Sequence, residues 1–244
     1  MKERVALITG GARGIGRAIA LKIAESGWSV AICYRTSKSE AAETIEGVHE
    51  KGAQGMAVAA DVSDPTASED LVRQVEKKWG RIDALINCAG PYHRVPLLEE
   101  TVEGWHAMFS NNLDHIFYLS RLVTPGMIER KWGRIITFSM ANADRLIAQP
   151  NLTAHYIAKV GVLVLTRTLA RVLAPHGVTV NAISPGFIAT GSAPDEELKE
   201  MEKKIPARYI GMPEDAVSVT EFLLSDEARY INGANIHLSG GWGI

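Results

Sequence analysis

A glycine-rich turn near the start of the chain has the spacing of a phosphate-binding site. It lies between an apolar run at 5–9 and a helical pattern at 15–26. Glycines there let the backbone turn sharply and let a pyrophosphate reach the amides of a helix N-terminus, where the dipole favours negative charge. The turn is not a P-loop, because Arg17 and Ala18 follow Gly16 in place of lysine and a hydroxyl residue. The residues expected to bind the phosphates are Gly10, Arg13, Gly14, Ile15 and Gly16.

A second group of residues, in the middle of the chain, has side chains suited to proton transfer. His155 and Tyr156 precede Lys159 by four and three residues in a helical pattern. At 3.6 residues per turn, their side chains lie roughly 40° and roughly 60° to either side of the lysine, so both can face one cleft without pointing at one place. Imidazole titrates near pH ~6.5, and an ammonium group lowers the pKa of a nearby phenol.

The elements that must position these groups alternate between strand and helix along the whole chain. Short apolar runs predict strands, and the longer periodic stretches between them predict helices. Parallel strands need crossover connections, so this alternation favours a doubly wound α/β fold, with a seven-stranded, mostly parallel sheet covered by helices on both faces. The predicted strands are 5–9, 29–34, 55–59, 84–87, 134–139, 179–184 and 235–238, and the predicted helices are 15–26, 38–51, 65–79, 101–130, 152–175 and 213–224.

The chain is expected to form a single domain over residues 1–244, because no linker or low-complexity tract interrupts the alternation. The segment at about 187–211 has no strand pattern but contains a charged helical stretch at 195–204. It follows the end of a strand, which is where open α/β sheets bind their ligands. We therefore expect it to be a lid on the substrate side, embedded in the domain.

Composition excludes several other classes of protein. With 26 Lys and Arg against 28 Asp and Glu, the net charge is −2; the basic clusters are only doublets, so nucleic acid is not an expected partner. The longest apolar run falls far short of the ~20 residues that span a membrane. The charged N-terminus is unlike a signal peptide, and Cys33 and Cys88 suit free thiols in a reducing compartment. We expect a cytoplasmic protein, and no spacing of ligand residues indicates a metal site.

Several motifs, in order along the chain, resemble those of the short-chain dehydrogenase/reductase family and most of all its 3-oxoacyl-(acyl-carrier-protein) reductases. The resemblance begins with Thr9 and the glycine turn and covers essentially all 244 residues. It implies a Rossmann fold, a nicotinamide cofactor, and reduction of a carbonyl to an alcohol on a small-molecule or acyl-carrier-bound substrate. The further positions that it implies for cofactor binding are Asp61, Val62, Asn87, Ala89, Gly90, Lys159, Pro185, Gly186, Ile188 and Thr190.

The resemblance also implies a catalytic set, which this chain keeps only in part. The family has an asparagine in the long helix, a serine at the end of the fifth strand, and a tyrosine four residues before a lysine. Asn112 and Lys159 match this pattern. The serine position falls on Met140, with Ser139 one residue earlier, and the tyrosine position falls on His155.

Three interpretations of this departure stay open. In the first, a local shift of the helix lets Tyr156 act as the acid, with Ser139 or Asn142 as a second hydrogen-bond donor. In the second, His155 is the acid. In the third, the site is degenerate, and the chain binds its cofactor in a regulatory or scaffold role without efficient ketone reduction. The connection before the helix is longer than is usual in the family, so Asp144 is a further candidate for the site.

The residues after the second strand predict NADP(H) as the cofactor. A dinucleotide fold that selects NAD usually has an acid there for the ribose 2′-OH, whereas a 2′-phosphate calls for cations. Here the strand ends in Tyr34, Arg35 and Thr36 with no acid, and Arg13 lies in the glycine turn. The two arginines can converge on the phosphate. The same segment also resembles the pteridine reductases of the family, which are the alternative substrate class.

The long helical patterns predict self-association. The stretch 160–165 is apolar on nearly all sides, and the predicted helix 101–130 has apolar residues at helical spacing, namely Phe109, Leu113, Ile116 and Leu119. A helix that is apolar all round must be buried on more than one side. One side packs on the sheet, and the other is expected to meet a second copy, which fits the homotetramers that the family forms.

Overall fold

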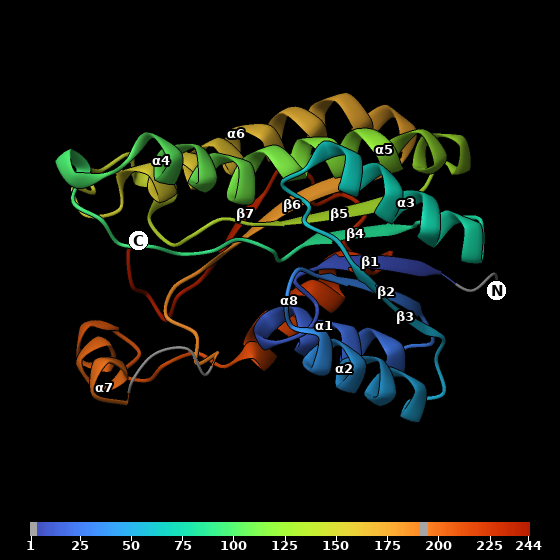
Figure 1. The fold of residues 1–244 in the computed structure, drawn as a ribbon, viewed down its shortest axis with the longest axis horizontal. Helices are drawn as coiled ribbons and strands as arrows, with labels where there is room; N and C mark the ends of the chain where they lie inside the picture. The colour runs from blue at the N-terminus through green and yellow to red at the C-terminus, as the bar shows by residue number, and fades with distance from the viewer. Residues whose placement is uncertain (1–3, 191–194) are drawn as a thin grey trace.

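The computed structural model describes residues 4–190 and 195–244, whose strands form one sheet (Figure 1). The strand order is β3-β2-β1-β4-β5-β6-β7. Every pairing is parallel, so the expected sheet is confirmed and has no antiparallel edge. The strands are β1 (Val5–Thr9), β2 (Ser29–Tyr34), β3 (Gly55–Ala59), β4 (Ala84–Asn87), β5 (Gly133–Phe138), β6 (Val178–Pro185) and β7 (Asn235–Leu238).

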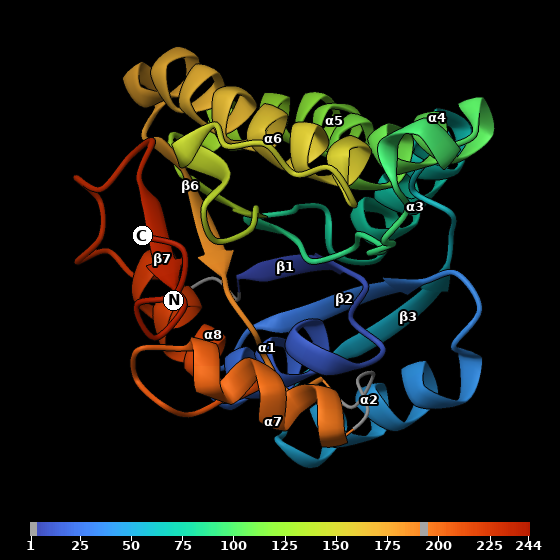
Figure 2. The same cartoon turned by 90° about the vertical axis from the view of Figure 1, so that its left-hand side faces the viewer.

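The helices cover both faces of the sheet (Figure 2). On one face lie α1 (Gly14–Glu25), α2 (Lys38–Glu50) and α8 (Pro213–Leu224), and on the other lie α3 (Pro65–Trp79), α4 (Val102–Phe109), α5 (His115–Arg130) and α6 (Thr153–Leu173). The charged helix α7 (Asp195–Lys204) stands apart from both layers. Single turns of tighter helix occur at Leu97–Glu99, Ala143–Arg145 and Ala174–His176. None of the helices in the described part of the chain is long and apolar enough to cross a membrane.

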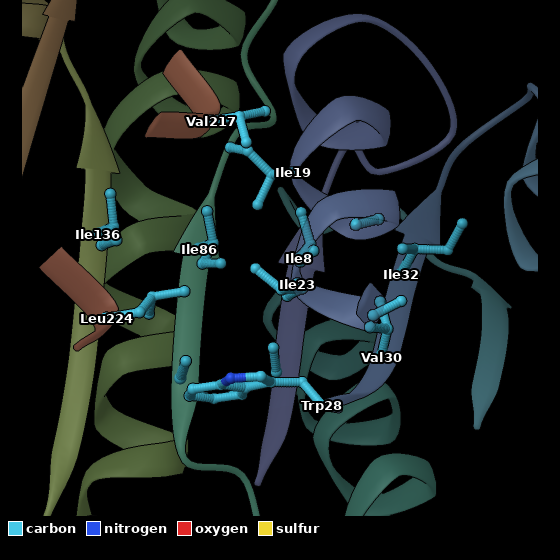
Figure 3. Packing of buried hydrophobic residues seen from close by; sticks show 14 of the residues in the cluster. Ile8, Ile19, Ile23, Trp28, Val30, Ile32, Ile86, Ile136, Val217 and Leu224 are labelled. Atoms are coloured by element: carbon cyan, nitrogen blue, oxygen red, sulfur yellow. The ribbon is translucent and has the colours of Figure 1, made fainter. Parts of the chain in front are cut away.

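Alternate side chains of the inner strands pack into the two helical layers, because these strands are buried on both faces, whereas the edge strands β3 and β7 are only partly buried. On β4, Ile86 packs toward α1 and α8, whereas its neighbour Leu85 belongs to the cluster on the opposite face. Figure 3 shows the first of these clusters from close by. Fully burying such a side chain contributes about 1.5–3 kcal/mol. The labelled members of this cluster are Ile8, Ile19, Ile23, Trp28, Val30, Ile32, Ile86, Ile136, Val217 and Leu224.

The helix expected over 101–130 is interrupted by a wider π-turn at Ser110–Asp114, which separates α4 from α5. Side chains of the turn satisfy the helix backbone, because Asn111 Nδ2 and Ser110 Oγ both donate to the Ala107 carbonyl, at 2.9 and 3.3 Å. π-turns of this kind are frequent at functional sites. This one carries Asn112, whose side chain is fully buried.

Candidate functional site

The glycine turn lies where the strand order reverses, at the carboxyl ends of β1 and β4. A Cβ on Gly10 would lie 3.2 Å from the Ala89 backbone, and Thr9 Oγ1 accepts a hydrogen bond of 3.0 Å from the Ala89 amide. A Cβ on Gly16 would lie 2.5 Å from the Gly10 carbonyl oxygen, so only glycine fits there. The glycine turn after β1 and the turn after β4, which contains Ala89, are therefore in direct contact and form one continuous surface.

The N-terminus of α1 is open to an anion. Arg13 precedes the helix in an extended conformation, makes no capping hydrogen bond with its side chain, and is followed by a first turn without acidic residues. The amides of that turn and the positive end of the helix dipole thus have no side-chain partner in the helix. Thr190 reaches this turn from the end of β6, since a Cβ on Gly14 would lie 3.4 Å from Thr190 Cγ2.

Arg35, which the sequence predicts to select the cofactor, directly follows β2. Arg35 Nη1 lies 3.7 Å from Asp61 Oδ2 and 3.4 Å from Asn111 Oδ1, and its side chain is mostly exposed. Burial opposes ionisation of Asp61, but hydrogen bonds from Ser63 and the Arg35 charge hold the pKa of that carboxyl below its usual value. Tyr34 is the last residue of β2, Thr36 follows it, and Val62, next to Asp61, is buried in the core. Arg35 therefore joins the β2 and β3 ends.

Three of the predicted residues converge on one point beyond β4. A Cβ on Gly90 would lie 2.6 Å from Asn112 Oδ1 and 3.3 Å from Lys159 Nζ. Lys159 is buried and donates to the Phe138 carbonyl at 2.9 Å. Burial lowers the pKa of Lys159 to about 8, so it stays mostly cationic at pH 7. Asn87, at the end of β4, donates to the Ile136 carbonyl at 3.5 Å and anchors this turn to β5.

The end of β6 forms the opposite wall. Gly186 is in close contact with Ser239, because a Cβ there would lie 3.0 Å from the Ser239 Cα atom. Beyond Pro185, the chain makes an isolated bridge between Ile188 and Gly211, which closes the base of the predicted lid at 187–211. Residues 191–194 of that segment lie outside the described residues, so its role as a lid stays a prediction.

His155 lies on α6 one helical turn before Lys159, close enough for the lysine charge to act on its ring. It is only 5% exposed, and its ring lies edge to face against Tyr92, with 5.2 Å between ring centroids. Burial and the Lys159 charge lower the pKa of His155 to about 3, although the Pro91 carbonyl opposes the shift. The imidazole is therefore neutral at pH 7. Its Nδ1 atom is buried without a hydrogen-bond partner.

Tyr156 faces a different part of the molecule, the loop between β5 and α6. Its hydroxyl donates to the Asn142 carbonyl at 2.9 Å and accepts from the Ile147 amide at 3.1 Å. The ring is buried. Both hydrogen bonds tie α6 to the loop, and they occupy the phenol with backbone groups.

Ser139 and Met140 lie side by side where β5 ends. The Ser139 hydroxyl is buried and donates to the Lys159 carbonyl at 2.8 Å, so it binds the backbone of α6. Met140 is half-buried and packs against a small cluster that includes Leu163 and Ala182. A thioether is a weak acceptor and cannot donate a hydrogen bond to a carbonyl.

The loop between β5 and α6 is held against β7. Asp144 Oδ2 lies 2.9 Å from His237 Nε2 and accepts from Asn235 Nδ2 at 3.2 Å, which draws Asp144 toward the sheet edge. Asn142 adopts a left-handed conformation with φ of 64°. A Cβ on Gly243 would lie 3.1 Å from Asn142 Cβ, so the end of the chain packs on this loop.

The sequence motifs do not identify Tyr92, which lies against His155 in the structure. The one feature of the sequence that could have indicated it is its position two residues after Gly90.

Both cysteines are free: Cys33 is buried near the end of β2, and Cys88 is half-buried in the turn after β4. Burial raises the pKa of Cys33 to about 12 and raises that of Cys88 as well. Among residues 4–190 and 195–244, no three His, Cys, Asp or Glu side chains are grouped to hold a metal ion.

Comparison with known proteins shows which proteins the chain resembles over nearly its whole length. A family model described as enoyl-(acyl carrier protein) reductase matches residues 10–243. A 3-oxoacyl-(acyl-carrier-protein) reductase from Staphylococcus epidermidis is 36% identical over 242 residues, covering 98% of both chains. The enzyme of that name from Synechocystis is 35% identical, covering 99% of this chain and 97% of its own. The crystal structure of acetoin dehydrogenase from Salmonella typhimurium superposes with a TM-score of 0.90 at 27% identity, covering 98% and 96%.

Proposed function

The chain belongs to the short-chain dehydrogenase/reductase family, and on that premise we propose that it reduces a carbonyl to an alcohol with NADP(H). The observation that carries the proposal is the convergence of Gly90, Asn112 and Lys159 beside the glycine turn. The two curated relatives are named for 3-oxoacyl-(acyl-carrier-protein) reduction. A 3-oxoacyl thioester, free or carried by an acyl carrier, is therefore the proposed substrate class.

The residues present fit a nicotinamide dinucleotide. Gly10 and Gly16 leave no room for a Cβ, so the backbone of the turn is bare where a pyrophosphate would bind. The first amides of α1 have no side-chain partner in the helix and can donate to it. Arg13 and Arg35 would hold a 2′-phosphate, which supports NADP(H) rather than NAD(H). Lys159 would hold the nicotinamide ribose. When bound, the cofactor supplies the hydride.

The side chains at the convergence point suit the charge that hydride transfer creates. As the carbonyl carbon is reduced, negative charge develops on its oxygen, and preorganised donors and cations stabilise it. Lys159 provides a cation in a buried setting, where a charge acts more strongly than in water. His155 contributes a neutral imidazole, and Asn112 holds the Pro91 carbonyl at 3.1 Å through Nδ2.

Steady-state oxidation of NADPH with a short 3-oxoacyl thioester tests the proposal. We expect turnover by the wild-type chain and a loss of about 100-fold or more in kcat for Lys159→Met. Lys77→Met, an exposed lysine of α3, serves as the matched control and should keep wild-type kcat.

Cofactor binding without reduction is the outcome that contradicts the proposal. If a fluorescence titration shows NADPH binding while no 3-oxoacyl thioester is reduced, the chain fits the degenerate alternative, a regulatory or scaffold protein. A dihydropteridine in the same assay tests the other substrate class, and its reduction in place of the thioester would replace the proposed substrate.

A further inference from the structure

Carbonyl reduction needs a proton at the oxygen as well as a hydride at the carbon, and the two hydroxyls suggested by sequence are bound elsewhere. The Tyr156 hydroxyl lies between the Asn142 carbonyl and the Ile147 amide. The Ser139 hydroxyl donates to the Lys159 carbonyl. The neutral state of His155 at pH 7 also removes the imidazolium that would donate a proton. None of these three groups is therefore set to supply the proton.

Tyr92 lies on the segment that leads from β4 to α4 and is fixed on both sides. On one side, the Pro91 carbonyl accepts a hydrogen bond of 3.1 Å from Asn112 Nδ2. On the other, His93 Nε2 lies 2.7 Å from Glu100 Oε2, and the Glu100 side chain is largely buried. The backbone of Tyr92 is thus tied to the π-turn and to the start of α4.

The ring of Tyr92 lies over the face of α6 that bears the predicted chemistry. Its centroid is 5.2 Å from that of His155, with 82° between the ring planes, which is a favourable edge-to-face contact. His155 and Lys159 are four residues apart and share one helix face. The tyrosine is 59% exposed, so its phenol is open to a substrate and to water, unlike the buried Tyr156.

A positive charge stands close to this segment. Lys159 Nζ lies 3.3 Å from the place of a Cβ on Gly90, two residues before Tyr92. A buried ammonium there stabilises negative charge that develops on a nearby carbonyl oxygen.

Resting on the proposed reductase activity, we propose that Tyr92 is the catalytic residue that protonates the carbonyl oxygen, and that His155 is a positioning residue that holds the Tyr92 ring. A hydride forms the new bond to the carbonyl carbon, and the π electron pair moves to oxygen. That pair takes the proton as the O–H bond of Tyr92 breaks. The phenolate then recovers a proton from solvent water.

The test compares Tyr92→Phe with Tyr230→Phe, a fully exposed tyrosine remote from the site, in the NADPH oxidation assay. Removing the phenolic hydroxyl should lower kcat by about 100-fold or more and leave the Kd for NADPH unchanged. Tyr230→Phe should keep wild-type kcat. For the positioning role, His155→Ala should lower kcat, whereas His155→Phe, which keeps an aromatic edge, should restore much of it.

Other outcomes would contradict the role of Tyr92, the role of His155 or the reductase activity itself. If Tyr92→Phe keeps kcat within threefold while Tyr156→Phe abolishes turnover, the acid is Tyr156 and the inference fails, although the reductase proposal stands. If His155→Phe is as inactive as His155→Ala, the imidazole itself takes part, and the positioning role is wrong. If the wild-type chain reduces no carbonyl at all, the proposed function and the inference fall together.

Discussion

Burial lowers the pKa of two neighbouring basic side chains of the site, with different results for their charge. It lowers the pKa of His155 to about 3 and that of Lys159 to about 8. At pH 7 the imidazole is therefore neutral, whereas most Lys159 side chains keep their charge. One turn of α6 thus presents a hydrogen-bonding ring and a cation side by side, and the difference follows from the reference pKa values of the two groups.

The lysine pKa predicts a pH dependence of stability. An unfolded chain returns Lys159 to a pKa of about 10.5. Between pH ~8 and ~10.5 the unfolded chain binds more protons than the folded one, so this group makes the free energy of unfolding rise with pH, by about 3 kcal/mol in total. Urea unfolding of the cofactor-free protein at pH 7.5 and 10 measures the rise. Lys159→Met should lack it, and parallel pH curves for the two proteins would contradict the burial of a charged lysine.

The proposed selection of NADP(H) over NAD(H) predicts that Arg35 contributes to NADPH binding. Its loss removes a charge-assisted contact with a 2′-phosphate, worth about 1.5–3 kcal/mol, so Arg35→Ala should weaken NADPH binding by roughly 10- to 100-fold. NADH binding should not change, because NADH has no phosphate there. Fluorescence titration with both cofactors measures the difference, with Arg73→Ala on the exposed surface of α3 as control. Equal weakening for both cofactors would show that Arg35 does not read the phosphate.

At the scale of elements, the sequence predicts the sheet well and the active-site helices less well. The strands are short apolar runs, most of them buried on both faces, and their predicted bounds agree with the structure to within one residue at each end. The π-turn at Ser110–Asp114 is different, because i→i+5 bonding leaves no mark on apolar periodicity. The directions of the side chains on α6 also could not be predicted. The helix angle allows His155 and Tyr156 to face one cleft, but a hydrogen bond to the Asn142 carbonyl holds the Tyr156 hydroxyl against the loop before α6.

The hydrogen bonds of Tyr156 predict a local effect on the loop between β5 and α6. In Tyr156→Phe, the Asn142 carbonyl loses a donor and the Ile147 amide loses its acceptor. Leaving such groups unpaired costs about 1–3 kcal/mol. Hydrogen exchange at the Ile147 amide should accelerate markedly, with Tyr230→Phe as the control. Unchanged exchange at Ile147 would mean that the loop keeps its position without the phenol.

At the scale of the whole molecule, the layer of α5 and α6 exposes several large apolar side chains. Phe117 on α5 and Val164 and Val172 on α6 are each at least half exposed. Exposed apolar patches on a helical layer mark association surfaces, which supports the proposal of a homotetramer. Light scattering at micromolar concentration should give a multiple of the 26.5 kDa chain mass, and Val164→Glu with Val172→Glu should lower it. A wild-type monomer would contradict the proposal.

The two free cysteines have a practical consequence. Thiolates are the nucleophiles that attack alkylating reagents, and the raised pKa values of Cys33 and Cys88 keep both sulfurs protonated at neutral pH. Folded molecules should therefore resist iodoacetamide, and unfolded ones should react. The labelling rate, measured by mass spectrometry, therefore reports how often the molecule opens around these two thiols, and a cofactor bound at the proposed site should slow it.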